Sequence, residues 1–262
     1  MSADELTIRR LDRHAAEAFA EFVNADPSLG GDVAQVADAT VFRWPDVPIV
    51  LFNHAVGLGN ERPPTDDEID RILELFREKG VQGMIQLSPL ADQNEIGKRL
   101  AARGLEPGPS WSVLGLTPDR WTPAAASPSI SIAGVTAASR EDFVRVLLES
   151  FQMGPPVDRA VIASIDKPDV YCFLARWDGE PAGCGQLLFK ADVGGLFSGG
   201  VLERFRRRGM HGALIDARLR AAFDRHVDLC YSETEEVNGQ SHRDLARHGF
   251  FLAYEHVNWL MR

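Results

Sequence analysis

An arginine-rich turn at residues 201–214 is the part of the sequence best suited to hold an anion. It reads VLERFRRRGMHGAL and lies between an apolar, strand-like run and a segment with helical spacing. The first backbone N–H groups of a helix have no intrahelical partner and lie at the positive end of its dipole. Gly209 and Gly212 let the backbone approach a phosphate closely, and three consecutive arginines add positive charge. The pattern favours a pyrophosphate cradle over a merely solvated basic turn.

The same turn resembles the acetyl-CoA signature of the GNAT acetyltransferase superfamily, V-x-P-x-x-R-x-x-G-x-G/A. Val201, Arg206 and Gly209 fall on this signature in register. Glu203 stands at the proline position, and His211 stands where the family has a second glycine or alanine. The imidazole ring replaces a hydrogen or a methyl group, so we expect altered packing against the pyrophosphate.

A second block, after the turn, matches the family as well. Asn238, Ser241, Gly249 and Phe250 reproduce its pattern of an asparagine, a small residue and a glycine followed by an aromatic residue. The resemblance covers residues 130–262. It implies an α/β (α+β) fold, a mixed and mostly antiparallel sheet flanked by helices, whose fourth and fifth strands part to admit the pantetheine arm.

The resemblance also implies a cofactor, acetyl-CoA (coenzyme A), and a set of binding residues. The pantetheine is expected to hydrogen-bond the strand backbone near residues 199–201, as an added strand would, and the N–H of Val201 to polarise the thioester carbonyl. The residues expected to bind the cofactor are Gly199, Gly200, Val201, Arg206, Arg207, Arg208, Gly209, Met210, His211, Gly212, Asn238 and Ser241.

Several residues are candidates for the proton-transfer groups. Many family members place a tyrosine, acting as general acid, where this chain has Leu245. Tyr231, Tyr254 and His242 are nearby alternatives; the thiolate could also leave unprotonated, or the domain could bind the cofactor without catalysis. For the general base, Glu233 is the first choice because it ends the fifth strand, where the acceptor would approach. It belongs to an acidic cluster with Glu235 and Glu236, which could instead be a solvated loop, and Glu203 is a weaker candidate.

The elements that must position these residues can be predicted from periodicity. In the C-terminal half, Ser139 and Asp142 predict a capping box at the start of a helix. The other predicted helices are residues 157–165, 210–226 and 241–247, and the predicted strands are residues 130–135, 170–177, 182–189, 195–202, 227–231 and 250–260.

The N-terminal half ends with a similar order of elements. Thr65 and Glu68 predict a capped helix, followed by a strand at 81–87, a helix at 91–103 and a strand at 111–116. A Pro-rich stretch separates the halves, which predicts tandem GNAT-like domains at residues 1–118 and 130–262 joined by a linker at 119–129.

The N-terminal domain is expected to be a degenerate copy that does not bind coenzyme A. Four carboxylates and one arginine occupy residues 57–68, before and at the start of its long helix, and these acids would repel a pyrophosphate. We expect this domain to serve acceptor binding or packing. His54, Trp44 and Trp111 could line an acceptor site, although buried core residues are the simpler interpretation.

Composition limits the possible partners, location and metal binding of the protein. The 262 residues include 28 Lys and Arg against 38 Asp and Glu, a net charge of −10, which argues against a nucleic-acid partner. No apolar run is long enough for a membrane span and no secretory signal is readable, so we expect no membrane partner and a cytoplasmic location. Three widely spaced cysteines, Cys172, Cys184 and Cys230, predict no metal site.

Two functions from different classes agree with these observations. The first is an acetyl-CoA-dependent N-acetyltransferase acting on a small-molecule amine. The second is a noncatalytic acyl-CoA-binding module whose N-terminal half contacts a protein partner. Acylation of a protein amine is a third reading, and a homodimer is compatible with each.

Overall fold

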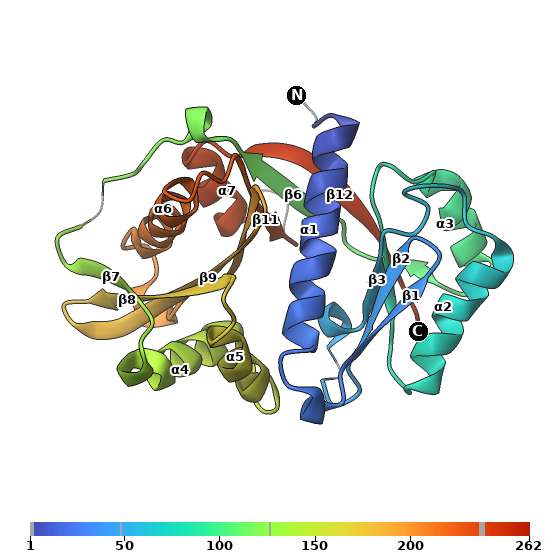
Figure 1. Ribbon diagram of the computed structural model, residues 1–262, viewed down its shortest axis with the longest axis horizontal. Coiled ribbons are helices and arrows are strands. Elements are labelled where there is room, and N and C mark those ends of the chain that lie inside the picture. The colour runs from blue at the N-terminus through green and yellow to red at the C-terminus, as the bar shows by residue number, and fades with distance from the viewer. Residues whose placement is uncertain (1–2, 48, 126, 236–238) are drawn as a thin grey trace. The chain divides into compact units, whose positions relative to one another are not determined.

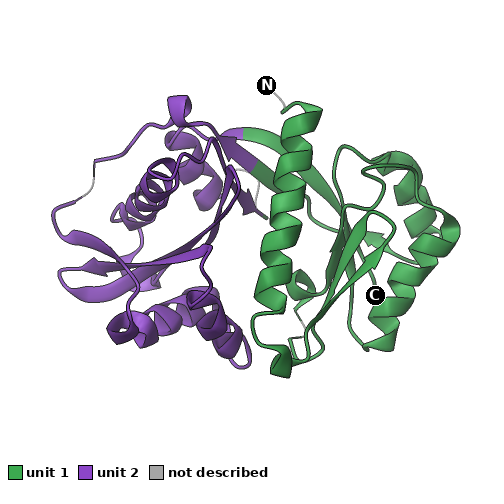
Figure 2. Cartoon of the chain, viewed as in Figure 1, with its two compact units in different colours: residues 1–113, 235–237, 252–262 green, residues 114–234, 238–251 purple. Residues whose placement is uncertain are grey.

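The computed structural model describes residues 3–47, 49–125, 127–235 and 239–262 (Figure 1). Backbone contacts divide the chain into two compact units (Figure 2). Unit 1 falls within Met1–Val113, Glu235–Val237 and Leu252–Arg262, and unit 2 within Leu114–Thr234 and Asn238–Phe251. Each unit is therefore built from more than one stretch of the chain.

Unit 1 combines helices with a mixed sheet. Its sheet order is β1-β2-β3-β4-β12, and β5 also pairs with β12. The elements are α1 (Glu5–Val23), β1 (Asp32–Val36), β2 (Ala39–Arg43), β3 (His54–Val56), α2 (Asp66–Glu78), β4 (Met84–Leu87), α3 (Gln93–Ala101), β5 (Glu106–Pro107), the first half of β6 (Trp111–Leu116) and most of β12 (Phe251–Leu260).

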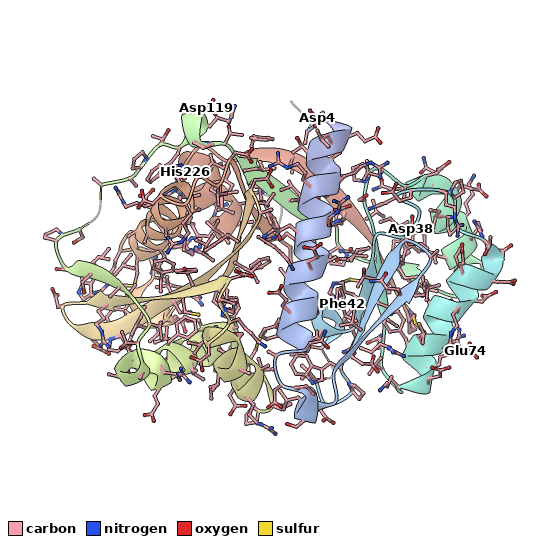
Figure 3. All side chains as sticks on the ribbon, in the orientation of Figure 1. Asp4, Asp38, Phe42, Glu74, Asp119 and His226 are labelled. Carbon is pink, nitrogen blue, oxygen red and sulfur yellow. The ribbon has the colours of Figure 1, made fainter. Side chains whose placement is uncertain are left out.

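The helices of unit 1 begin and pack as their sequences dictate. Asp4 caps α1 by accepting from the Thr7 N–H, and its side chain is visible at the start of that helix in Figure 3. Thr65 and Glu68 form the predicted capping box on α2. One face of α2 buries Ile69, Ile72 and Phe76 in a core shared with β4 and α3, as its helical spacing predicts.

The last strand of the chain belongs to the sheet of unit 1. β12 pairs antiparallel with β4 in the register Val257↔Leu87 to Leu260↔Met84. The Trp259 ring also lies against α3, because a Cβ at Gly97 would meet its Cζ2 at 2.6 Å. Periodicity predicts this strand, but the partner that it pairs with lies about 170 residues away in sequence. The domain boundaries expected from the sequence stay a prediction.

Unit 2 has the sheet order β6-β11-β10-β9-β8-β7. The β10–β11 pair is parallel, whereas β7–β8, β8–β9 and β9–β10 are antiparallel. The elements are the second half of β6, β7 (Ile130–Gly134), α4 (Arg140–Phe151), α5 (Val157–Ile165), β8 (Val170–Trp177), β9 (Glu180–Lys190), β10 (Val193–Val201), α6 (Met210–Phe223), β11 (Leu229–Thr234) and α7 (Gln240–Arg247).

Helices cover the sheet of unit 2 on both faces, α6 and α7 on one side and α4 and α5 on the other (Figure 1). This order of strands and helices confirms the fold class expected from the sequence. One local prediction is wrong: Ser139 makes no side-chain cap with Asp142. The capping box instead joins Thr136 to Ser139, in a single 3-10 turn before α4.

Two further observations concern the whole described chain. Within the residues described, no helix is both long and apolar enough to cross a membrane. The sequence prediction assigned no elements before residue 65, and so it missed α1 and the strands β1, β2 and β3.

Candidate functional site

The turn between β10 and α6 leaves the start of α6 open. Gly209 is the N-cap residue, with φ of +79°, and as a glycine it has no side chain with which to cap the helix. The first helical bond runs from the Ala213 N–H to the Gly209 carbonyl (3.0 Å). The N–H groups of Met210, His211 and Gly212 therefore precede the helical ladder. No acidic residue lies in this first turn, and a Cβ at Gly209 would meet no atom within 4 Å.

The arginines of this turn are exposed and held in different ways. Arg206 donates from Nε to the Val201 carbonyl (3.2 Å) at the end of β10. Arg207 has φ of +61°, a left-handed conformation that non-glycine residues adopt rarely. The Arg208 guanidinium stacks 4.9 Å from the centre of the Trp177 ring. Arg204, by contrast, forms ion pairs with the carboxylates of Glu149 and Glu180.

These features fit a pyrophosphate. Unpaired N–H groups at a helix start and nearby guanidinium groups are the donors that phosphate oxygens accept from most strongly. The corresponding helix of unit 1 differs, because the Thr65 hydroxyl already accepts from the Glu68 N–H and the Glu68 carboxylate accepts from the Thr65 N–H. Arg62 pairs with that carboxylate and lowers the pKa of Glu68 to about 2. The start of α2 therefore carries negative charge of its own.

Strands β10 and β11 part after a short paired stretch. Their parallel register runs from Val193↔Leu229 to Gly195↔Tyr231 and goes no further among the described residues. Just beyond it, the Ser232 hydroxyl donates to the Leu196 carbonyl (3.0 Å). β10 continues to Val201, where it pairs with β9. The resemblance predicts such a split, and an edge of this kind can hydrogen-bond an extended ligand.

A β-bulge lies in the part of β10 that β11 leaves unpaired. The register with β9 shifts between Phe197 and Gly200, and Ser198 has φ of +52°. A bulge re-aims the strand and leaves a residue outside the ladder. The predicted binding residue Gly199 therefore belongs to the bulge, and Gly200 resumes the pairing with β9 opposite Cys184. Neither glycine has a β11 partner among the described residues.

Glycines bring the two covering helices close to this segment. A Cβ at Gly200 would lie 2.7 Å from the Ser150 Cβ of α4. On the α6 side, a Cβ at Gly199 would lie 3.1 Å from Arg218 Nη2 and 3.3 Å from His211 Nε2. Only glycine leaves room for these side chains without a shift of strand or helix.

Arg218 is a buried cation on the inner face of α6. Its side chain donates to the carbonyls of Leu214 (3.0 Å) and Phe197 (3.1 Å), the latter in the bulge. Only 2% of the residue is exposed, and this burial lowers the pKa of Arg218 to about 10. The guanidinium is still protonated at neutral pH. Arg218 was not among the residues predicted from the sequence. Its position could have indicated it, because it lies one helical turn after Leu214, on the face of the helix that is otherwise apolar.

His211 projects from the first turn of α6 toward α7. Its Nδ1 lies 2.9 Å from Asp244 Oδ2, and Asp244 also accepts from Gln240 (2.9 Å) and pairs with Arg247. Burial opposes the ionisation of Asp244, but the hydrogen bond and charge of His211 hold its pKa below the usual value. The sequence indicated His211 as a binding residue and did not single out Asp244.

A second histidine ties α7 to α6 behind this site. His248 Nδ1 lies 2.7 Å from the Asp244 carbonyl, and its Nε2 lies 3.5 Å from Asp216 Oδ2. Asp216 also accepts from the Trp121 indole (2.9 Å) and the Ala124 N–H (2.9 Å). Trp121 and Ala124, which lie between β6 and β7, are thereby anchored to α6.

Most of the other proposed acid–base residues lie on β11, on α7 and in the turn after β10. Glu233 is half-buried near the end of β11, Glu235 is exposed just after it, and Glu203 is exposed after β10. Tyr231 is buried with its ring edge-on to Phe197. His242 and Ser241 lie on the first turns of α7, half-buried and exposed respectively. The residues Asn238 and Glu236, also predicted to be functional, lie outside the described part of the chain.

Tyr254 belongs to a buried polar cluster in unit 1. Its hydroxyl donates to Asp12 Oδ1, which His256 Nε2 also approaches (3.2 Å), while Asn60 donates to Asp12 Oδ2 (3.0 Å). Burial would raise the pKa of Asp12, but His256 and the other donors hold it below its usual value. Trp44 and His54 are buried in the same unit, which agrees with their interpretation as core residues; burial lowers the pKa of His54 to about 3.

The three cysteines are free thiols. All three are buried, and no group of metal-binding side chains occurs among the residues that the structure describes. Burial raises the pKa of Cys172 to about 11 and the pKa values of Cys184 and Cys230 to about 12. They are therefore unreactive thiols at neutral pH.

Comparison with known proteins agrees with this geometry. Residues 138–250 match the acetyltransferase (GNAT) family. The matched segment runs from just before α4 to the residue before β12, and it includes β10, the arginine-rich turn and α6. No curated protein matches the sequence.

Solved structures resemble the chain over most of its length. A GCN5-related N-acetyltransferase from Kribbella flavida has a TM-score of 0.67 at 18% identity, covering 92% of this chain and 94% of that chain. One from Sphaerobacter thermophilus has a TM-score of 0.65 at 17% identity, covering 86% and 80%. A tandem GNAT protein from the clavulanic acid biosynthesis pathway has a TM-score of 0.62 at 15% identity, covering 85% and 78%. At these identities the likeness concerns the fold.

Proposed function

Because the chain belongs to the GNAT superfamily, with its family domain at residues 138–250, we propose that it is an acetyl-CoA-dependent N-acetyltransferase acting on a small-molecule amine. The observation that carries the proposal is the uncapped start of α6 beside the unpaired segment of β10. A helix start without acids suits a pyrophosphate, and an open strand edge suits the amide-bearing pantetheine arm.

Acetyl-CoA, when bound, supplies an acetyl group activated as a thioester. In this proposal the N–H groups of Met210, His211 and Gly212 bind the pyrophosphate, and Arg206 and Arg207 add charge. The open segment Gly199–Val201 orients the pantetheine, and the Val201 N–H polarises the carbonyl. Glu233 accepts the proton of the acceptor amine.

The net charge of −10 and the carboxylates at the end of β11 favour a cationic acceptor such as a primary amine. The noncatalytic alternative is favoured by one observation. Leu245, at the position of the family's tyrosine, is only 2% exposed and lies in the apolar core of unit 2. It can neither donate nor accept a proton, so this position supplies no general acid.

Thiol release from acetyl-CoA separates the two functions. We expect acetyl-CoA to raise the melting temperature of the protein and to release thiol with at least one of spermidine, glucosamine, lysine or tyramine as acceptor. Stabilisation without thiol release with these amines, or with a peptide that has a free N-terminus, would favour the noncatalytic module. Neither stabilisation nor thiol release would contradict both functions.

A further inference from the structure

Two nitrogen-bearing side chains of α6 converge on Gly199 of β10. A Cβ at this position would lie 3.1 Å from Arg218 Nη2 and 3.3 Å from His211 Nε2. The glycine leaves that volume free of side-chain atoms, so both nitrogens face a bare stretch of strand. Because Gly199 lies where β10 has no β11 partner, the nitrogens face the segment that the proposed function assigns to the pantetheine.

Asp244 fixes which nitrogen of His211 faces the strand. The 2.9 Å contact with Oδ2 engages Nδ1, and the low pKa of Asp244 keeps its carboxylate ionised and therefore an acceptor. Nδ1 then carries a hydrogen, as in other Asp–His pairs, and Nε2 remains for exchange with a ligand. Gln240 and Arg247 hold the other carboxylate oxygen of Asp244 in turn.

Arg218 has a donor left over. Its Nε and Nη1 bond to backbone carbonyls, whereas Nη2 donates to no atom in the described part of the chain. A donor that has no acceptor within the described protein can bond a ligand instead. No carboxylate forms an ion pair with this guanidinium among the described residues, so its charge acts on whatever lies beside Gly199.

We propose that His211 and Arg218 receive the sulfur of coenzyme A, His211 as the proton donor and Arg218 as a fixed positive charge. This inference rests on the proposed function. Leu245 has no group that can donate a proton. The inference therefore assigns the role of proton donor to His211, at the position where the family signature has its second glycine or alanine.

The proton balance closes within the site. His211 in its protonated form gives the Nε2 proton to the sulfur, which takes the electron pair of the breaking C–S bond. The imidazole is left neutral, with its remaining hydrogen on Nδ1 toward Asp244. The amine forms the new C–N bond, and the proton it loses returns His211 to its protonated form directly or through Glu233. The products are an amide and the free thiol.

The thiol pKa of bound coenzyme A tests this assignment without an acceptor. Iodoacetamide alkylation of the complex is followed against pH between 6 and 10. Cys172, Cys184 and Cys230 are buried, with pKa values raised to about 11 or 12, so the protein's own thiols contribute little. Nearby cations favour the thiolate, so we expect the wild-type complex to lower the thiol pKa by about one unit or more relative to free coenzyme A.

The variant is His211→Gln, and the matched control is His226→Asn. His226 is exposed, lies beyond the opposite end of α6 and is labelled in Figure 3. Its φ of +62° suits asparagine. We expect His211→Gln to lose most of the lowering and His226→Asn to keep it. The groups around His211 that also affect its charge are Asp244 and Arg218, with Arg247 and His248 one contact further away.

A second variant, Asp244→Asn, tests the same inference if His211→Gln does not fold. Asp244→Asn keeps the size of the side chain and removes the carboxylate that holds His211 Nδ1, so Nε2 is no longer fixed toward Gly199 and the thiol pKa should rise above that of the wild-type complex. If wild type and His211→Gln give equal thiol pKa values, the inference is overturned and the proposed function is not. If His211→Gln does not fold, equal thiol pKa values for wild type and Asp244→Asn have the same meaning. If coenzyme A does not bind the wild type, the proposed function itself fails.

Discussion

Arg218 donates from Nη1 to the carbonyl oxygen of Phe197 over 3.1 Å, and this bond ties the middle of α6 to the bulge of β10. The same guanidinium donates to the Leu214 carbonyl from Nε. Removing it leaves a buried carbonyl without its donor and a cavity beside Gly185 and Gly199, whose Cβ positions lie about 3 Å from it.

We predict that Arg218→Met lowers the free energy of unfolding by roughly 1–3 kcal/mol, the usual cost of an unsatisfied buried polar group. Urea denaturation followed by tryptophan fluorescence measures the change. The matched control is Arg220→Met on the exposed side of the same helix, where we expect less than about 1 kcal/mol. An equal effect of the two substitutions would contradict the structural role of Arg218.

Gly97 of α3 packs against the ring of Trp259, and this contact reports on the place of β12 in unit 1. A glycine-to-alanine change inside a helix normally stabilises by about 0.5–1 kcal/mol. Here the methyl group would meet a rigid ring at 2.6 Å, so we predict that Gly97→Ala destabilises by roughly 1–3 kcal/mol, the usual cost of overpacking.

Combining Gly97→Ala with Trp259→Leu identifies the cause. Without the ring, the alanine should recover its ordinary stabilising effect, which gives a coupling between the two changes of at least about 1 kcal/mol in a double-mutant cycle. Additive effects would mean that β12 does not pack on α3 as described.

His248 should make the stability of unit 2 depend on pH. Burial by itself lowers the pKa of this histidine, but Asp216 and the Asp244 carbonyl outweigh burial and raise it above the usual 6.5. A raised pKa means that the folded state holds the proton more tightly than the unfolded state does. The contribution of His248 is therefore complete below about pH 6.5 and is lost as pH rises through the folded pKa.

The measurement compares wild type with His248→Gln at pH 5.5 and pH 8.5. We predict that the substitution costs more free energy of unfolding at pH 5.5 than at pH 8.5. The pKa of Asp216 is lowered by the same contact against the effect of burial, so this carboxylate stays charged at both values. A cost that is constant with pH, or larger at pH 8.5, would show that the contact with Asp216 is not charged.

Local patterns were enough to predict most elements from residue 65 onward. The helix predicted at 157–165 matches α5 to the residue, because its apolar spacing and neighbouring turns are local signals. The pairing of β12 with β4 could not be predicted, since periodicity gives the faces of a strand and not its partner. α1 has an N-cap at Asp4 and buries Ile8 and Leu11, so its helical signal was present and was overlooked.

The candidate site also has a part that the sequence predicts and a part that it does not. The glycine and arginines of the cradle are consecutive in sequence, so the motif alone predicts the uncapped start of α6. The approach of Arg218 and His211 to Gly199 depends on a strand bulge and on the seating of a helix against a sheet. These are tertiary features, which the sequence pattern does not contain. In the sequence, His211 is a residue that differs from the family motif; its pairing with Asp244 in the structure is what suggests a role for it.

Calorimetric titration of acetyl-CoA tests the central claim, that the start of α6 is a pyrophosphate cradle. Arg206→Glu and Gly209→Asp place a negative charge at the cradle; Gly179→Asp places the same charge at another exposed glycine with positive φ and no atom within 4 Å of its Cβ position. We predict that wild type and Gly179→Asp bind alike and that both cradle variants bind at least about tenfold more weakly, as expected for the loss of charge-assisted bonds. Unchanged affinity in both cradle variants would contradict that claim.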